Sequence, residues 1–297
     1  MANTFTNGGI FIDQIAEQSL DYLSTQFHPL RAFARDFSTD ISGAGESVST
    51  RVPSSMTVSD LSTGYTATDV TSTGITINLN KFKGYSMAFT DLEVSKAGNF
   101  DWLSSIFLAP ALEVTLDAVM DDLLALVLNA NFSANEVITA ANFDLDEVAD
   151  LASDLTTAKC PKSERALVLP SAYYASLAKD NLVQDASAYG NAGPIQDNIV
   201  QKAHGFSIYE YTGIPANGEN LAGIALHPSA LCLAARQPAA PSDGSVSVAD
   251  ITDPSTGLPI QLRTWYDNTA GKHYLSMGVL YGVAVGNGAA LKRIKSA

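Results

Sequence analysis

The sequence is poor in charge, in cysteine and in long hydrophobic runs, and each shortage excludes a class of protein. Of its 297 residues 16% are charged and 46% hydrophobic, which is too little charge for a disordered chain. Two cysteines, Cys160 and Cys232, are too few for a disulfide framework. The longest nearly uncharged apolar run, 123–128, is far shorter than the ~20 residues of a membrane span, and no signal peptide is visible at the start. These shortages predict a soluble, intracellular, folded protein.

Basic residues are also scarce and unevenly placed. Seventeen Lys and Arg face 31 Asp and Glu, for a net charge of −14, which disfavours generic attraction to nucleic-acid phosphates. Between Lys96 and Lys159 the chain holds eleven acids and no base, whereas Lys292, Arg293 and Lys295 reverse the sign at the end. Two interpretations stay open. The chain has two solvated surfaces of opposite charge, or it is a subunit that meets copies of itself head to tail.

Patterns typical of catalytic and metal sites are missing. The sequence has no GxSxG, P-loop or HExxH motif, and neither cysteine has a CxxC partner. Gly286-Asn-Gly288 lacks the helix and the distant acid of a dinucleotide fingerprint, so it predicts a turn between strands. No histidine stands at metal-ligand spacing from another histidine or a cysteine; the four are His28, His204, His227 and His273. We therefore expect no enzyme, no cofactor, and no catalytic, cofactor-binding or metal-binding residue.

Two acidic patterns resemble metal sites but lack the partners such sites need. Glu113, Asp117 and Asp121 lie four apart, on one face of a helix, without the Glu-x-x-His pair of helical metal sites. This row is expected to be solvated or to face an interface. Asp144-Leu-Asp146 begins like an EF-hand loop but lacks its central glycine, and the apolar residues there continue a helical period.

The N-terminal third predicts an arm and a long hairpin. Residues 10–27 place Ile12, Ile15, Leu23 and Phe27 at helical spacing, so residues 1–46 are expected to be an extended arm with one short helix. Alternation of period two predicts strands at 48–52 and 75–79, joined by a Ser/Thr-rich segment. An isolated hairpin is only marginally stable, so we expect it to lie on a neighbouring molecule.

The rest of the chain predicts a long helix and two sheet regions. Thr90-Asp-Leu-Glu93 reads as a capping box, and a long helix is expected from about Pro110, where a first turn tolerates proline. The middle region is expected to be a compact α/β unit with helices at 143–158 and 171–179 and strands at 166–169, 206–211 and 224–226. Strands 258–266 and 275–285 are expected to pair. The second of these has bulky residues at odd positions and small ones at even positions, so one face lets backbone or a helix approach closely.

This order of parts resembles the major capsid proteins of tailed double-stranded DNA bacteriophages, with the Hong Kong ninety-seven-like (Johnson) fold. The local resemblance lies in residues 205–215 before the 222–231 segment, and in residues 258–266 followed by 276–285. It implies an α+β fold made of five parts. These are the N-terminal arm (1–46), the extended β-hairpin loop (47–89), the peripheral domain with its spine helix (90–139), the α/β axial domain (140–255) and the C-terminal strands of the peripheral domain (256–297).

The same resemblance implies a structural protein that self-assembles into pentamers and hexamers of an icosahedral shell. The shell encloses packaged phage double-stranded DNA in the virion, after assembly in the host cytoplasm. The implied partners are copies of the chain, a separate scaffolding protein, a portal and a decoration protein, with no specific nucleic-acid recognition and no membrane. Some relatives cross-link a lysine of the extended loop, but residues 57–73 hold no lysine, so a noncovalent shell is expected. An encapsulin-type nanocompartment shell and an unrelated α/β enzyme are the alternatives.

Overall fold

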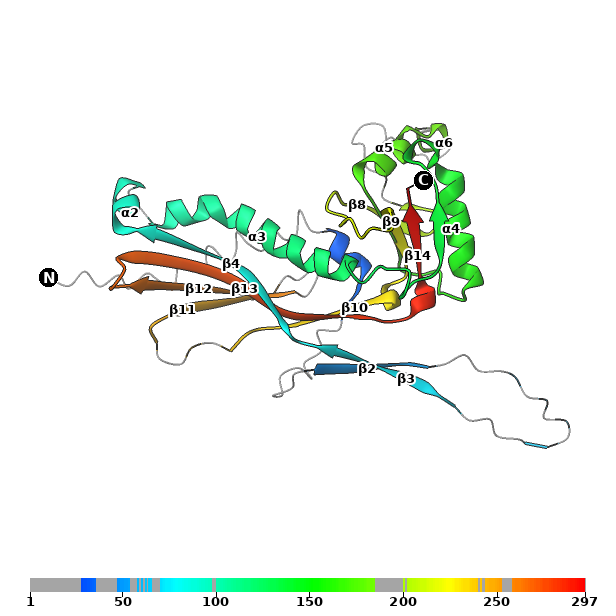
Figure 1. Ribbon diagram of the computed structural model, residues 1–297, viewed down its shortest axis with the longest axis horizontal. Coiled ribbons are helices and arrows are strands. Elements are labelled where there is room, and N and C mark those ends of the chain that lie inside the picture. The colour runs from blue at the N-terminus through cyan, green and yellow to red at the C-terminus, as the bar shows by residue number, and fades with distance from the viewer. Residues whose placement is uncertain are drawn as a thin grey trace.

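A computed structural model describes residues 28–35, 47–53, 70–97, 100–184, 202–239, 244–252 and 258–296, with isolated positions between them. Within these residues, the β structure consists of two six-stranded sheets and a two-stranded hairpin. The body is elongated, with one sheet and a long helix at one end and the second sheet at the other (Figure 1). The helix expected at 10–27, most of the arm and most of segment 57–73 lie outside the described residues.

The first sheet is built around one long antiparallel strand, β13. Its strands are β1 (Ala34–Arg35), β4 (Lys81–Thr90), β10 (Leu231–Arg236), β11 (Ser247–Thr252), β12 (Pro259–Asp267) and β13 (Lys272–Val285). β13 pairs antiparallel with β12, β10 and β4. The predicted pairing of the last two long strands is confirmed, because Asp267 lies opposite Lys272 at their turn.

Helices α2 (Asp91–Ala97) and α3 (Phe100–Leu124) cover one face of this sheet (Figure 1). The predicted capping box is confirmed. The Thr90 backbone N–H donates to Glu93 Oε2 at 2.8 Å, and the Glu93 N–H donates to Thr90 Oγ1 at 3.3 Å. α3 buries its predicted apolar stripe, with Leu112, Leu116 and Leu123 each 0% exposed. Packing of a whole helix face against a sheet fixes this end of the molecule.

The predicted start of the long helix is wrong. α3 begins at Phe100, and Pro110 lies inside it, where a proline costs about 3 kcal/mol relative to alanine. The reason lies in the residues before the proline. The rings of Phe100 and Phe107 pack on Phe89 of β4, with centroids 6.1 and 5.8 Å apart. This tertiary packing outweighs the local preference for a proline in the first turn.

The second sheet has the order β5-β14-β9-β6-β8-β7. Its strands are β5 (Asn135–Val137), β6 (Arg165–Leu169), β7 (Lys202–Ala203), β8 (Phe206–Glu210), β9 (Leu221–Leu226) and β14 (Leu291–Lys295), and its helices are α4 (Leu145–Thr157), α5 (Ser171–Lys179) and α6 (Asn181–Gln184). The predicted helices and strands of this α/β region are confirmed. Asp144 is the N-cap of α4, where its side chain accepts from the Asp146 N–H at 2.9 Å.

The two sheets do not divide the chain at the expected residues. β10 and β11 belong to the first sheet although they lie within 140–255, and β14 joins the second sheet although it lies within 256–297. Strand partners are chosen by long-range packing, which local alternation of residues does not report. Figure 1 shows β13 running along the body toward the end where β14 lies.

Two adjacent 3-10 turns carry the chain between the sheets. They are η4 (Pro228–Ala230) and η5 (Gly288–Ala290); η1 (His28–Ala32) and η3 (Ala140–Asn142) lie elsewhere. The Gly286 N–H donates to the Ala230 carbonyl at 2.8 Å, which ties the two crossings together. Asn287 caps η5, so the predicted turn at Gly286-Asn-Gly288 is confirmed. Within the described ranges, the helices are too short or too polar to cross a membrane.

Candidate functional site

The hairpin of β2 (Ser47–Pro53) and β3 (Ser72–Asn78) leaves the body of the molecule (Figure 1). Its register runs from Ser47 opposite Asn78 to Pro53 opposite Ser72, which confirms the predicted hairpin. Farther out, the side chains of Val58, Tyr65 and Val70 are 101%, 94% and 70% exposed. A projecting pair of strands with exposed apolar side chains gains stability from contact with a second molecule.

The base of the hairpin is held against the first sheet, on the face opposite α3. Ile77 and Leu79 are 1% and 7% exposed and pack with Ala234 of β10. Cys232 and Ala284 flank this cluster, which is separate from the main core. Burying an isoleucine or leucine stabilises by about 1.5–3 kcal/mol, so these few contacts decide whether the hairpin stays on the body.

The small residues of β13 make this close approach possible. A Cβ added to Gly282 would lie 2.1 Å from the Asn78 carbonyl oxygen, so only glycine fits beneath the end of β3. A Cβ added to Gly278 would lie 3.0 Å from the ring of Phe82. The prediction that the small-residue face of this strand admits close backbone is therefore confirmed, and what approaches is the base of the hairpin.

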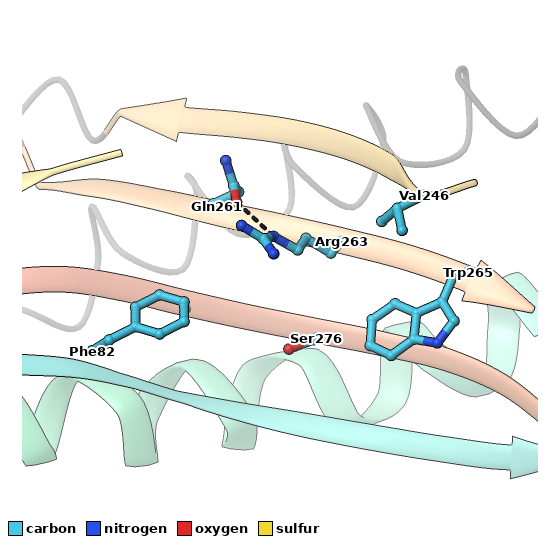
Figure 2. Close-up of a pocket in the computed structure, with 7 residues that line it drawn as sticks. Phe82, Val246, Gln261, Arg263, Trp265 and Ser276 are labelled. Atoms are coloured by element: carbon cyan, nitrogen blue, oxygen red, sulfur yellow. Dashed lines mark hydrogen bonds between the residues drawn. The ribbon is translucent and has the colours of Figure 1, made fainter. Parts of the chain in front are cut away.

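A shallow groove of about 280 Å³ lies on the same face of the first sheet (Figure 2). It is lined by Phe82, Val246, Gln261, Arg263, Trp265, Ser276 and Gly278. The indole ring of Trp265 stacks on Tyr274, with ring centroids 4.9 Å apart and planes 1° from parallel. Phe82 is 60% exposed at the other end. The groove therefore offers two aromatic surfaces to whatever binds there.

A guanidinium lies in the middle of this groove. Arg263 Nε donates to Gln261 Oε1 at 2.6 Å (Figure 2), and Gln261 Nε2 donates to Asp250 Oδ1 at 2.8 Å. No carboxylate within the described segments forms an ion pair with Arg263. Aromatic walls around a cation suit a partner that is apolar and acidic. Sequence reasoning missed this groove because its residues come from separate strands.

An ion cluster ties the strand that follows the hairpin to α3. Asp122 accepts from Lys81 Nζ at 2.8 Å and from Lys83 Nζ at 2.7 Å, and Tyr281 Oη donates to the same carboxylate. Burial by itself would raise the pKa of Asp122, but these three hydrogen bonds outweigh it and lower the pKa to about 2. The Asp122 carboxylate is 17% exposed, so its ion pairs are partly shielded from solvent.

Asp122→Asn should therefore lower stability in a pH-dependent way. A carboxylate with a depressed pKa stabilises the fold above its ordinary value of 3.8, and that contribution disappears as the pH falls toward about 2. We expect the free energy of unfolding of the variant to be about 2 kcal/mol lower than that of the natural chain at pH 7. The two free energies should converge as the pH falls from 3.8 to about 2. Urea unfolding of unassembled protein at several pH values measures this. Asp121→Asn, at an exposed neighbouring residue, is the control. A difference in the free energy of unfolding between Asp122→Asn and the natural chain that stays constant down to pH about 2 contradicts the prediction.

The acidic row predicted on the long helix lies on α3, away from the sheet. Glu113 and Asp121 are exposed, whereas Asp117 is partly buried and accepts from Tyr211 Oη at 3.2 Å. Burial raises the pKa of Asp117, and repulsion from Glu113 and Asp121 raises it further. The hydrogen bond from Tyr211 lowers the pKa but does not cancel this rise. Tyr211 comes from the end of β8, so this contact joins the two halves of the body.

The interpretation of the basic C-terminus as a solvated surface is wrong for Lys292 and Arg293, whereas the head-to-tail meeting of copies stays a prediction. Lys292 Nζ pairs with Glu136 at 2.8 Å and also with Asp154, both of which belong to the acidic block. The side chain of Arg293 is 1% exposed and pairs with Glu219. β14 is an inner strand of the second sheet, so folding turns these cations inward, where burial requires carboxylate partners.

The cysteines and histidines do not assemble into a site in the part of the chain that the structure describes. Cys160 is buried with its thiol 3.5 Å from the Ala289 carbonyl, and burial raises the pKa of that thiol, which disfavours a nucleophilic thiolate. His227 accepts from the Ser229 N–H at the η4 crossing. Among the described residues, no three His, Cys, Asp or Glu side chains lie close enough together to hold a metal ion.

Comparison with solved structures identifies the fold. A chain of Mycobacterium phage Che8 is similar with a TM-score of 0.61 and 17% identity, over 89% of this chain and 89% of that chain. A chain of the mature capsid of bacteriophage PhiM1 is similar with a TM-score of 0.60 and 11% identity, over 90% of this chain and 86% of that chain. This chain has the phage capsid fold. The predicted α+β architecture is thus confirmed.

The phage capsid fold also occurs outside particles named as phages. A virus-like particle from Pyrococcus furiosus is similar with a TM-score of 0.54 and 13% identity, over 95% of this chain and 98% of that chain. The sequence itself matches no protein-family model and no curated protein. The phage capsid fold is therefore evident in the three-dimensional arrangement rather than in any stretch of sequence.

Proposed function

We propose that this protein is the shell-forming subunit of a tailed-phage capsid, a structural protein and not an enzyme. Its copies form pentamers and hexamers that close into an icosahedral shell around packaged double-stranded DNA, assembled in the host cytoplasm and retained in the virion. The observation that carries the proposal is the projecting hairpin on a phage capsid fold. Closed symmetric assembly multiplies modest contacts between neighbours into a stable particle.

Each part of the chain takes one role in this shell. We infer that residues 1–46 are the arm and that the β2–β3 hairpin of loop 47–89 reaches over an adjacent subunit, while β4 of that loop stays in the first sheet. We infer that 140–255, without β10 and β11, meets its copies around the symmetry axes as the axial domain. Residues 90–139 and 256–297, without β5 and β14, form the peripheral domain around α3 and β13. A separate scaffolding protein, a portal and a decoration protein complete the assembly, and the net charge of −14 fits a shell that encloses DNA without recognising its sequence.

The groove of the first sheet is the receptor for the hairpin of the adjacent subunit. In Figure 1 the hairpin extends away from β12, which forms one wall of the groove. The hairpin of one subunit therefore points away from its own groove, and the hairpin of a second copy fills it. Exposed Tyr65 and Val58 supply apolar side chains, and Asp60 supplies a negative charge, to meet the aromatic rings and Arg263. Such a contact is heterologous, and it generates rings when the rotation between neighbouring copies closes.

Negative-stain microscopy and sedimentation of the purified chain test the proposal. Closed shells, or rings of five and six subunits, are the expected result, with the chain's scaffolding partner added where assembly requires it. Arg263→Glu, which opposes Asp60 with a like charge, should reduce the yield of particles, whereas Arg236→Glu on β10 serves as a matched charge reversal outside the groove lining. A chain that stays monomeric at high concentration with every partner present refutes the proposal.

A protein nanocompartment is the second candidate, and one observation favours it. The virus-like particle from Pyrococcus furiosus shares the fold across 95% of this chain. Both candidates build the same kind of shell and differ in what it encloses. Absorbance of purified native particles at 260 and 280 nm, followed by nuclease-protected DNA analysis, separates them, because a capsid holds a genome and a compartment holds protein cargo.

The shell should be held together without covalent bonds between subunits. Lys81 and Lys83, on the strand returning from the hairpin, are held in ion pairs with Asp122, and segment 57–73 has no lysine to react. Native particles boiled in SDS are therefore expected to run as a single band at monomer size. A ladder of dimers and higher species that survives boiling and reducing agent contradicts this prediction.

A further inference from the structure

The exposed side of α3 carries apolar side chains in its first half. Val114 is 58% exposed, Pro110 is exposed, and Phe107 is 44% exposed at the edge of this side, where its ring also packs on Phe89 of β4. Asp117 and Asp121 continue the same line along the helix. The steps between these five residues are three, four, three and four, which is the spacing of a seam that packs against a second helix. We call these five residues the outer stripe.

The inner face of α3 is already covered, so the outer stripe is surplus apolar surface. Leu112, Leu116 and Val119 are each 0% exposed against the first sheet. A helix that is apolar on both of its faces is normally buried on both. In the single chain, however, the described residues leave Phe107 and Val114 exposed. The first half of the outer stripe is therefore suited to a cover from another molecule.

The second half of the outer stripe fixes the charge of that cover. Asp121 is exposed, Glu113 flanks the stripe, and no Lys or Arg occurs in the sequence between Lys96 and Lys159. Acidic side chains repel packaged DNA, so DNA does not cover the stripe. The amphipathic segment 10–27 of a second copy is also disfavoured, because it contains three acids and no Lys or Arg.

We propose that the outer stripe binds a basic amphipathic helix of a partner protein. Leucine-like side chains of that helix pack on Phe107 and Val114, while Lys or Arg side chains meet Asp117 and Asp121. The inference deepens the proposed function and rests on it, because a shell built with a separate scaffolding protein needs a surface on its subunit where that protein binds. The helix lies along α3, as in a coiled coil, and contributes no catalytic group.

Two designed peptides test the proposal with the purified full chain. Both are fluorescent helices of about 20 residues with identical leucines at the seam positions; one carries Lys and the other Glu at the flanking positions. The Lys peptide is expected to bind and the Glu peptide to remain free. Val114→Asp should weaken the Lys peptide ~10-fold by placing a charge against leucine, and Asp121→Lys should weaken it ~5-fold by repulsion. Fluorescence anisotropy at two salt concentrations measures both effects.

Asp150→Lys on α4 is the matched control, since it changes the net charge as Asp121→Lys does but lies outside the stripe. It should alter binding less than ~2-fold, as a distant surface charge does. Equal binding of both peptides, unchanged affinity of Val114→Asp, or equal weakening by Asp150→Lys would overturn the proposal. Particle formation by the same variants is scored separately by microscopy. Shells that form while the peptide fails to bind therefore refute the docking surface and leave the proposed function standing.

Discussion

Gly282→Ala is expected to release the hairpin from the body and to abolish shell assembly, while the two main sheets stay folded. The added Cβ would lie 2.1 Å from the Asn78 carbonyl oxygen and 2.7 Å from its carbonyl carbon. Both are backbone atoms, which cannot rotate away as a side chain can. The end of β3 must therefore lift, which exposes Ile77 and Leu79 at a cost of up to about 1.5–3 kcal/mol each.

Hydrogen exchange and sedimentation together measure this result. The amides of the hairpin strands should lose protection in Gly282→Ala, and particles should be replaced by free subunits, because a hairpin without a fixed base cannot be aimed at a neighbour. Gly278→Ala is the matched control, on the same strand and face, for the exchange measurement alone, because Gly278 and Phe82 line the groove. Its Cβ would crowd the ring of Phe82, at 3.0 Å, and that ring can turn aside, while the Lys83 carbonyl oxygen lies at an ordinary contact distance of 3.8 Å. The hairpin amides of Gly278→Ala should therefore keep their protection. Normal assembly of Gly282→Ala would show that the hairpin base is not needed.

Features set by neighbouring residues were predictable from the sequence. Alternation of bulky and small side chains on β13 predicted a face open to close approach, and the turn at 267–272 predicted its pairing with β12. The capping box at Thr90 followed from residue types three positions apart. In each case the physical cause acts over a few residues, within one strand or one helical turn, so the pattern is written in a short stretch of the sequence.

Features that depend on distant residues were not predictable. The sequence could not show that Asn78 lies over Gly282 or that Lys292 pairs with Glu136. It also could not show that aromatic packing of Phe107 on β4 keeps α3 helical on both sides of Pro110. The candidate site has this character throughout. Phe82, Arg263 and Trp265 come from two strands that are not adjacent, with β13 between them, and only the pairing register brings them to one groove. Resemblance in the order of elements, rather than any motif, carried the prediction of the fold.

The pair formed by Arg293 and Glu219 should show the largest loss of stability on substitution. The side chain of Arg293 is 1% exposed; its guanidinium donates to Glu219 and, at 2.8 Å, to Asn129 Oδ1. The Glu219 carboxylate also accepts from the Asn129 backbone N–H at 3.0 Å. Glu219 therefore joins the segment after α3 to β14. Removing its carboxylate leaves a buried cation with one neutral partner, and such a charge is strongly unfavourable.

Glu219→Ala is expected to destabilise the unassembled chain by about 3–5 kcal/mol, and adding Arg293→Met to it should recover much of that loss. The second substitution removes the unpaired charge and keeps an apolar side chain of similar length in the core of the second sheet. Urea unfolding at neutral pH of the two single variants and the double variant completes the cycle. A double variant less stable than Glu219→Ala would mean that Arg293 is stabilised by its remaining bonds to Asn129. The C-terminal strand would then depend on hydrogen bonding, and not on compensation of charge, for its place between β5 and β9.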